Sequence, residues 1–397
     1  MSELQALLTP AGLELLDAVG PVDSSADVAR LVSRLRTDGH SPDLVSAVVG
    51  QAHLRTRAAA KFGPFAGRML FTRAGLEQAT RLGVAARHAQ RMRSAGVTRV
   101  ADLGCGIGGD SLAFTGAGLD VLAVDADEVT AAIAAYNLAP FGDSATVRFG
   151  TAEDADLGDS DAVWMDPARR TAGHSETRRV SADEYSPPLG WAFDLARRMP
   201  AGIKLGPAHD RDALPSDAEA QWVSADGSVV ELVVWTGALA RDGVRRSALV
   251  VRGERSHEIT GGADAEDAGV RDLGAFLHEP DGAVIRARLI GDVARSLEAG
   301  MLDPKIAYLT SDAAVTSPFV QSFRVRETTA ASPKAINAVL KAHDVGTLEI
   351  KKRGVDIDPA AFRKKLALRG SASATLILVR VGDRRRAILA DRVPAAS

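Results

Sequence analysis

A glycine-rich segment followed by an acidic residue is the part of this sequence best suited to bind a nucleoside-like ligand. The segment is Ala101-Asp102-Leu103-Gly104-Cys105-Gly106-Ile107-Gly108-Gly109-Asp110, and the next apolar run, 119–124, is followed by Asp125. Glycines remove side chains where a backbone must approach a ligand closely, and the start of a following helix offers N–H groups to that ligand. An acid at the end of the next strand can accept hydrogen bonds from both hydroxyls of a ribose.

The spacing of the glycines favours a methyl donor over a dinucleotide. Gly104, Gly106 and Gly108 give G-x-G-x-G, whereas a pyrophosphate-binding loop has G-x-G-x-x-G. Asp102 stands two residues before the first glycine, where its carboxylate could hold the ammonium group of S-adenosylmethionine. We therefore expect a cofactor site made of Asp102, Gly104, Cys105, Gly106, Gly108, Asp125 and Ala126, with Glu153 or Asp154 accepting the exocyclic amine of adenine.

The dipeptide Asp166-Pro167 is the candidate for the chemistry itself. It follows the apolar run 162–165, at the end of a predicted strand, where substrates meet cofactor in an open parallel sheet. A carboxylate beside a proline-constrained carbonyl can accept the two hydrogens of an exocyclic amine and turn its lone pair toward a methyl group. The carboxylate also stabilises the positive charge that develops on nitrogen. We expect Asp166 and Pro167 to be catalytic, and the following Arg169 and Arg170 to contact the substrate.

Together these segments resemble the trimethylguanosine-synthase-type branch of the class I S-adenosylmethionine-dependent methyltransferases. The resemblance covers about residues 70–170 and is carried by VADLGCGIGGD (100–110), VDAD (124–127), AYN (135–137) and Asp166-Pro167, with a similar segment from 71 to 88 before the core. It implies a Rossmann-like fold and S-adenosylmethionine as cofactor. It also implies that Asp102, Gly104, Gly106 and Asp125 bind the donor, and that Asp166 and Pro167 act on the exocyclic N2 of guanine.

The sequence departs from that family where the substrate base would stack. The family continues with a second proline and an aromatic residue, but Ala168 and Arg169 follow Asp166-Pro167 here. Stacking would then have to come from Trp164, from Phe71 or from the guanidinium of Arg169. Guanine N2, adenine N6 and an amine outside nucleic acids all stay open as acceptors.

The order of predicted elements indicates an α/β protein with flanking domains. Thr9-Pro10 and Ser41-Pro42 are helix starts, and apolar strands and helices alternate from Val97 onward. We predict an N-terminal helical domain (1–93) and a class I methyltransferase core (94–260). A linker of uncertain assignment (261–321) and a small basic α+β domain (322–397) follow.

The C-terminal domain is predicted to have the order βαβαββ, which resembles the ferredoxin-like, THUMP-like modules of some RNA methyltransferases. From Arg324 to Ser397 there are sixteen Lys/Arg against seven Asp/Glu, and from His53 to Arg93 there are nine against one. Two basic segments around an acidic centre are typical of a protein that binds a phosphate backbone. The residues expected to contact RNA are Lys351, Lys352, Arg353, Arg384, Arg385 and Arg386, together with Arg169 and Arg170.

Composition narrows the class of protein further. The single cysteine, Cys105, excludes an internal disulfide and a cysteine-cluster zinc site, and we expect no metal. The sequence has no apolar run of the length that spans a membrane and no signal-peptide pattern at its start, so we expect a cytoplasmic protein without membrane contact.

Three functions are compatible with these features. The first is S-adenosylmethionine-dependent N-methylation of an exocyclic base amine, guanine N2 or adenine N6, in a structured RNA such as tRNA or rRNA. The second is a non-catalytic RNA-binding protein that retains the cofactor-binding fold, which the missing aromatic after Asp166-Pro167 motivates. The third is a methyltransferase for a small molecule or a protein. The sequence does not indicate the oligomeric state.

Overall fold

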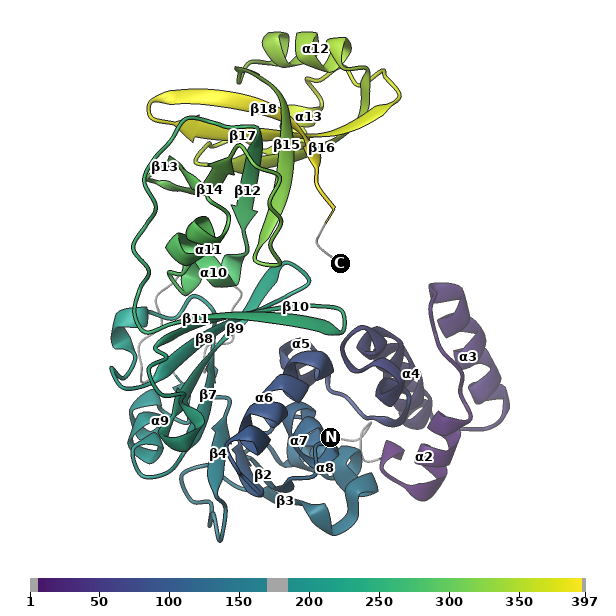
Figure 1. The fold of residues 1–397 in the computed structure, drawn as a ribbon. Coiled ribbons are helices and arrows are strands. Elements are labelled where there is room, and N and C mark those ends of the chain that lie inside the picture. The colour runs from purple at the N-terminus through teal and green to yellow at the C-terminus, as the bar shows by residue number, and fades with distance from the viewer. Residues whose placement is uncertain (1–5, 170–184, 395–397) are drawn as a thin grey trace. The chain divides into compact units, whose positions relative to one another are not determined.

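The computed structural model describes residues 6–169 and 185–394, which form two compact units (Figure 1). The first unit comprises Met1–Leu205 with Val234–Ala240, and the second comprises Gly206–Val233 with Arg241–Ser397. Within the described ranges, no helix combines the length and the apolar character needed to cross a membrane. The same residues contain no group of three or more His, Cys, Asp or Glu placed to hold a metal ion.

The first unit begins with helices whose starts follow the predicted capping residues. The side chains of Thr9, Ser24 and Ser41 each accept a hydrogen bond from a backbone N–H in the first turn, and Pro10 and Pro42 occupy first-turn positions. This confirms the helix starts predicted at Thr9-Pro10 and Ser41-Pro42. The elements are α2 (Pro10–Asp17), α3 (Ser25–Thr37), α4 (Pro42–Phe62), η1 (Gly63–Arg68), α5 (Arg73–Gln78) and α6 (Leu82–Ser94).

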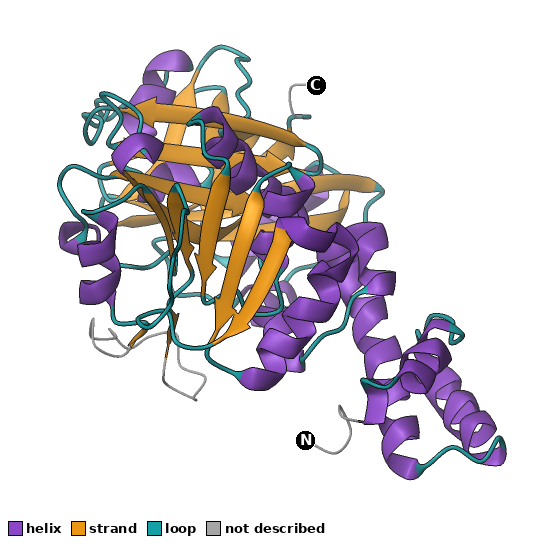
Figure 2. Ribbon diagram, turned by 90° about the horizontal axis from the view of Figure 1, so that it is seen from below, coloured by secondary structure: helices purple, strands orange, loops and turns teal. Residues whose placement is uncertain are grey.

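A parallel sheet forms the core of the first unit, with the strand order β7-β4-β1-β2-β3. Figure 2 draws the strands of the protein in orange and the helices in purple. From β1, the chain adds β2 and then β3 on one side of the sheet, and β4 and then β7 on the other. The topological switch point therefore lies between β1 and β4, as in Rossmann-like folds. This confirms the predicted α/β fold. The strands are β1 (Arg99–Leu103), β2 (Asp120–Asp125), β3 (Ala145–Phe149), β4 (Ala162–Met165) and β7 (Ala201–Leu205); between them lie α7 (Gly109–Gly116), α8 (Glu128–Leu138), η2 (Ala139–Ser144), the pair β5 (Ala168–Arg169) and β6 (Tyr185–Ser186), and α9 (Leu189–Ala196).

The second unit starts with strands β8 (Glu219–Ala225), β10 (Arg246–Arg252) and β11 (Arg255–Gly261), after the short helix η4 (Arg211–Ala213). β8 and β10 are parallel, and β10 and β11 are antiparallel. Strand β9 (Ser228–Thr236) is divided between the units, and η5 (Gly237–Leu239) follows it. Asp226 and Gly227, between β8 and β9, both have the positive φ that a tight turn between strands requires.

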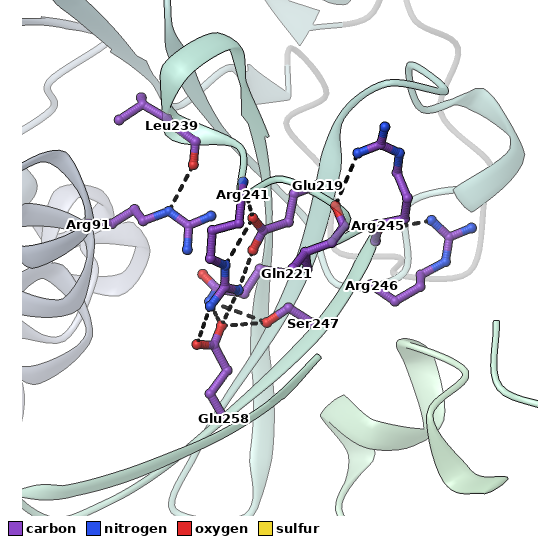
Figure 3. A network of polar contacts seen from close by, with 10 residues as sticks. Arg91, Glu219, Gln221, Leu239, Arg241, Arg245, Arg246, Ser247 and Glu258 are labelled. Atoms are coloured by element: carbon purple, nitrogen blue, oxygen red, sulfur yellow. Dashed lines mark hydrogen bonds and ion pairs between the residues drawn. The ribbon is translucent and has the colours of Figure 1, made fainter. Parts of the chain in front are cut away.

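A buried ion-pair network fixes the strands β8, β10 and β11 of this unit (Figure 3). Glu219 has no exposed side-chain surface, and it accepts hydrogen bonds from the backbone N–H and the guanidinium of Arg241. Arg241 also donates to both oxygens of Glu258, which accepts a further hydrogen bond from Ser247. Burial would lower the pKa of Arg241, but the hydrogen bonds that its guanidinium donates to the carboxylates of Glu258 and Glu219 raise it. The arginine therefore stays charged and compensates a fully buried carboxylate.

The rest of the second unit is a seven-stranded sheet, β13-β14-β12-β15-β18-β17-β16. Its C-terminal part is β15 (Val320–Ala330), α12 (Pro333–Ala342), β16 (Val345–Arg353), α13 (Pro359–Arg363), β17 (Ala372–Val381) and β18 (Arg384–Arg392), which is the predicted order βαβαββ. The preceding segment supplies β12 (Phe276–Pro280), α10 (Gly282–Arg286), α11 (Ile290–Ser296), β13 (Gly300–Asp303) and β14 (Ile306–Ser311). β12 pairs with β15, so residues that the sequence left unassigned extend the C-terminal sheet.

Candidate active site

The glycine loop lies at the carboxyl end of β1, as the sequence predicts. Gly104, Gly106 and Gly108 have φ values of +86°, +56° and +82°, a backbone conformation that glycine adopts without strain. The N–H groups of Gly104 and Cys105 donate to the carbonyl of Val124 at 2.9 and 3.0 Å, which fixes the loop against β2. A Cβ atom on Gly106 would meet no protein atom within 4 Å. The loop therefore borders open space, into which a ligand can fit without displacing a side chain.

Asp125 ends β2 beside this loop and is held by the backbone. Its Oδ2 accepts from Gly106 N–H and its Oδ1 from Asp127 N–H, both at 2.9 Å. Partial burial raises the pKa of Asp125, and these two N–H groups act against that rise. Ala126, which follows it, is exposed. The carboxylate is thus fixed in orientation and half-exposed, as a ribose-binding group must be.

Asp102, the other predicted cofactor ligand, lies deeper in the structure. Its side chain is almost fully buried and accepts a hydrogen bond from the hydroxyl of Ser111. Burial, followed by the charges of Asp110 and Asp166, raises the pKa of Asp102 to about 8. At neutral pH the carboxyl group of the ligand-free protein is therefore mostly protonated. A cationic ligand placed against it would favour the ionised form.

Residues beyond β3 complete this side of the site. Glu153 and Asp154 are both exposed, and Asp154 accepts a hydrogen bond from the hydroxyl of Thr151 at 2.7 Å within its own turn. Phe149 is the register partner of Asp125 on β3, and 63% of its side chain is exposed. Phe149 was not among the predicted cofactor-binding residues. Its position at the end of the strand that follows Asp125 could have indicated that it lies near this carboxylate.

Asp166 lies next to the glycine loop, at the carboxyl end of β4. Its backbone N–H donates to the carbonyl of Leu103, the last residue of β1, and a Cβ atom on Gly104 would lie 3.2 Å from its carbonyl oxygen. Its Oδ2 lies 2.5 Å from the ammonium nitrogen of Lys204. Lys204 was not among the predicted site residues. It lies near the end of β7, and only the order of the strands in the sheet shows that β7 is the neighbour of β4.

Two of the three side chains considered for base stacking are excluded by their burial. Trp164 is 0% exposed and Phe71 is 1% exposed, because both belong to the packed core of the first unit. The prediction that either could stack on a substrate base is wrong. The third, Arg169, is placed only through its backbone, which pairs with Tyr185 in β5 and β6. Arg170 lies outside the described residues.

The segment before α6 packs on the glycine loop. The side-chain amide of Asn137 donates to the carbonyls of Leu70 and Ile107 at 3.0 and 2.9 Å, and its oxygen accepts from Leu70 N–H. Gly75 approaches Ile107 so closely that a Cβ atom there would lie 2.5 Å from its side chain. The N-terminal helical region therefore braces the loop.

The predicted RNA-binding residues of the C-terminal sheet fall into two groups. Lys351 forms a 2.6 Å ion pair with Glu279, and the guanidinium of Arg353 lies over the ring of Tyr308, so their charges are engaged within the sheet. The other group is exposed and consists of Lys352, Arg384, Arg385 and Arg386. Lys352 pairs with Leu378 on β17, and Leu378 pairs with Ala387 on β18, the residue that follows the three arginines.

Comparison with known proteins assigns the family. The chain is 35% identical over 357 residues to an uncharacterised S-adenosylmethionine-dependent methyltransferase of Mycobacterium tuberculosis, found in strains CDC 1551 and H37Rv, with 88% of this chain and 95% of that protein covered. The chain belongs to the S-adenosylmethionine-dependent methyltransferases. This methyltransferase uses S-adenosylmethionine as its methyl donor, as the sequence predicts.

Other comparisons cover the fold and the flanking domains of this methyltransferase. A crystal structure of a proposed methyltransferase from Porphyromonas gingivalis is similar to it with a TM-score of 0.73 at 19% identity, covering 94% of this chain and 99% of that one. Residues 320–392 match the family model of THUMP domain-like sequences, which confirms the predicted C-terminal domain. Residues 1–58 match a domain family of unknown function.

Proposed function

We propose that this methyltransferase transfers a methyl group to an exocyclic amine of a base in a structured RNA, tRNA or rRNA. The observation that carries the proposal is the position of Asp166-Pro167. The dipeptide follows β4, directly beside the glycine loop that ends β1. A group that holds an acceptor amine must lie there, because the acceptor has to meet the methyl donor at the carboxyl edge of the sheet.

The cofactor would be held by residues from three neighbouring strands. Asp125 would accept the ribose hydroxyls, and Asp102 would bind the ammonium group. The backbone of Gly104, Cys105, Gly106 and Gly108 would line the space between them, with Ala126 beside it and Glu153 or Asp154 near the adenine. When bound, the cofactor supplies an electrophilic methyl group. The open space at Gly106 and the backbone-held carboxylate of Asp125 fit such a molecule.

Asp166 and Pro167 would orient the acceptor. The carboxylate of Asp166 and the backbone carbonyl of Pro167 each accept one hydrogen of the amine, which leaves the nitrogen lone pair directed away from them. As the nitrogen becomes positively charged, the carboxylate stabilises it and then receives the released proton. The buried positions of Trp164 and Phe71 mean that the base must be held by other groups, such as Arg169 and Arg170.

The RNA would be held chiefly through its phosphates. The exposed residues Lys352, Arg384, Arg385 and Arg386 lie on a THUMP-like sheet. They offer positive charge, and the register partners of the three arginines on β17, Val381, Arg380 and Val379, are not aromatic. Such a surface suits contacts to the shape and backbone of folded RNA better than reading of its sequence. The basic N-terminal segment, 53–93, adds charge in the first unit.

We expect Phe149→Ala to weaken the binding of S-adenosylmethionine about tenfold, because an aromatic ring exposed beside Asp125 can stack on the adenine. Isothermal titration calorimetry with the purified protein measures this directly. Phe65→Ala is the matched control, since Phe65 is also an exposed phenylalanine, 51% accessible, and lies in η1 of the helical region. Equal affinity in the wild type and Phe149→Ala would remove Phe149 from the cofactor site.

We expect the triple substitution of Arg384, Arg385 and Arg386 by Gln to weaken RNA binding about tenfold at low salt, and to reduce the salt dependence of binding by two to three ion equivalents. Filter binding of unmodified tRNA over a salt series measures both quantities. Replacing the exposed Arg363, Lys364 and Lys365 by Gln provides a control of equal charge on the same domain. Identical salt slopes for the wild type and the arginine variant would mean that RNA does not contact these three arginines.

The proposed function is tested in cells. Deletion of the gene should remove one N-methylated nucleoside from digested tRNA or rRNA, and expression of the wild-type protein should restore it. An unchanged nucleoside profile, combined with tight RNA binding by the purified protein, would favour the non-catalytic RNA-binding function. The observation that favours this second function is that Ala168 and Arg169, and no aromatic residue, follow Asp166-Pro167.

A further inference from the structure

Lys204 is a charged side chain that the structure places in direct contact with Asp166. It lies on β7, and the pairing of Val163 with Ala201 and of Met165 with Ile203 brings it alongside Asp166. Its Nζ lies 2.5 Å from Asp166 Oδ2, and it donates a hydrogen bond of 2.9 Å to the hydroxyl of Thr80. The side chain of Lys204 is only 12% exposed, so solvent screens this ion pair weakly.

A buried chain of polar groups holds Lys204 in place. The hydroxyl of Thr80, which accepts from Lys204, donates to Asp110 Oδ2 at 2.8 Å. Asp110 Oδ1 in turn lies 2.9 Å from Nδ1 of His88. Thr80, Asp110 and His88 are all buried. The ammonium group of Lys204 is therefore tied to the rigid helical part of the first unit, and an ion pair held in this way restricts the rotamers of Asp166.

Lys204 also balances the charge of several acids near the glycine loop. Burial raises the pKa of Asp102, and the ammonium group of Lys204 acts against that rise. Burial works against ionisation of Asp110 as well, but His88 and then Lys204 keep its pKa below the usual range. Lys204 is thus a shared counter-charge for Asp102, Asp110 and Asp166.

We propose that Lys204 is the positioning residue for Asp166, orienting its carboxylate for the acceptor amine and placing a positive charge at the acceptor end of the site. This inference rests on the proposed function of Asp166. It has a consequence that does not depend on the acceptor. S-adenosylmethionine carries a positive sulfonium, whereas S-adenosylhomocysteine carries a neutral sulfur, so a cation near the reacting end weakens the binding of the first relative to the second.

The test measures the affinities of both cofactor forms by calorimetry in four proteins: the wild type, Lys204→Met, Lys204→Arg and Asp166→Asn. In Lys204→Met, the ratio of S-adenosylmethionine affinity to S-adenosylhomocysteine affinity should rise by about three- to tenfold. Lys204→Arg should keep the wild-type ratio, because it keeps the charge. Asp166→Asn should lower the ratio. A purely structural lysine would weaken both ligands equally, so an unchanged ratio in Lys204→Met overturns the inference.

Methyl transfer to RNA gives the second readout. Lys204→Met should lower kcat by about ten- to a hundredfold, with the KM for RNA changed less than about threefold, since the lysine orients Asp166 and does not bind RNA. Lys204→Arg should recover most of the activity. Full activity of Lys204→Met contradicts the positioning role. If the affinity ratio shifts in Lys204→Met but the wild type methylates no RNA, the proposed substrate is refuted and Lys204 keeps its role. Thermal melts of all variants identify any that fail to fold.

Discussion

Asp166→Asn is expected to lower the rate of methyl transfer by about a hundred- to a thousandfold while leaving the affinity for S-adenosylmethionine within about twofold of the wild type. The substitution keeps the shape and one acceptor oxygen, but it removes the charge that stabilises the acceptor nitrogen and takes up its proton. Asp166 forms an ion pair with Lys204 at the carboxyl end of β4, whereas the predicted cofactor ligands Asp102 and Asp125 lie on β1 and β2. Single-turnover transfer of labelled methyl to RNA, with calorimetry for the cofactor, measures both parts of this prediction.

Asp159→Asn is the matched control for this experiment. Asp159 is an exposed aspartate near the other end of the same strand, where it pairs with Arg99 at the surface. A surface pair of this kind contributes little because solvent screens it, so its loss should leave both the rate and the melting temperature unchanged. If Asp166→Asn and Asp159→Asn turn over equally fast, Asp166 does not take part in the reaction.

Asp102→Asn is expected to weaken S-adenosylmethionine binding by about a hundredfold and at the same time to stabilise the ligand-free protein. Folding raises the pKa of Asp102 to about 8, so the buried carboxyl destabilises the fold at every pH above its unfolded value near 4. Between about pH 4 and pH 8, the free energy of unfolding should fall by up to about 1.4 kcal/mol per pH unit through this group. Asparagine removes that loss and still accepts the hydrogen bond from Ser111.

Two measurements check the prediction for Asp102. Urea unfolding at pH 5 and pH 7.5 should show a smaller loss of stability with pH in Asp102→Asn than in the wild type, with a gain of roughly 1–3 kcal/mol at the higher pH. Calorimetry should show that wild-type affinity for the cofactor rises with pH up to about 8, because binding of the ammonium group requires the ionised carboxylate. Undiminished cofactor affinity in Asp102→Asn would contradict the assignment of the ammonium group to this residue.

Local sequence patterns were sufficient to predict much of the fold. The glycine loop after β1 could be predicted because only glycine adopts its backbone freely, and the helix starts at Thr9 and Ser41 because capping depends on adjacent residues. The order βαβαββ of the THUMP-like domain followed from the alternation of apolar periods. These features depend on neighbours along the chain, which the sequence displays.

Features that depend on contacts between distant segments could not be predicted. The pairing of β12 with β15 joins residues 40 to 48 positions apart, and neither strand alone indicates its partner. The same holds for the ion pair of Lys351 with Glu279, which turns an apparently exposed basic residue into part of the sheet. Lys204 lies between these cases. Strands were expected to alternate with helices in this part of the chain, but the contact of Lys204 with Asp166 required the order of the strands in the sheet.

The most direct test of the proposed function is transfer of labelled methyl from S-adenosylmethionine to unmodified cellular RNA, with DNA and protein extract as parallel substrates and Asp166→Asn as the control of low activity. We expect label in RNA alone, recovered after digestion as a single nucleoside methylated on an exocyclic amine, and transfer at least about a hundredfold slower with Asp166→Asn. Label in the protein or small-molecule fraction, or label in RNA that Asp166→Asn transfers as fast as the wild type, would contradict it.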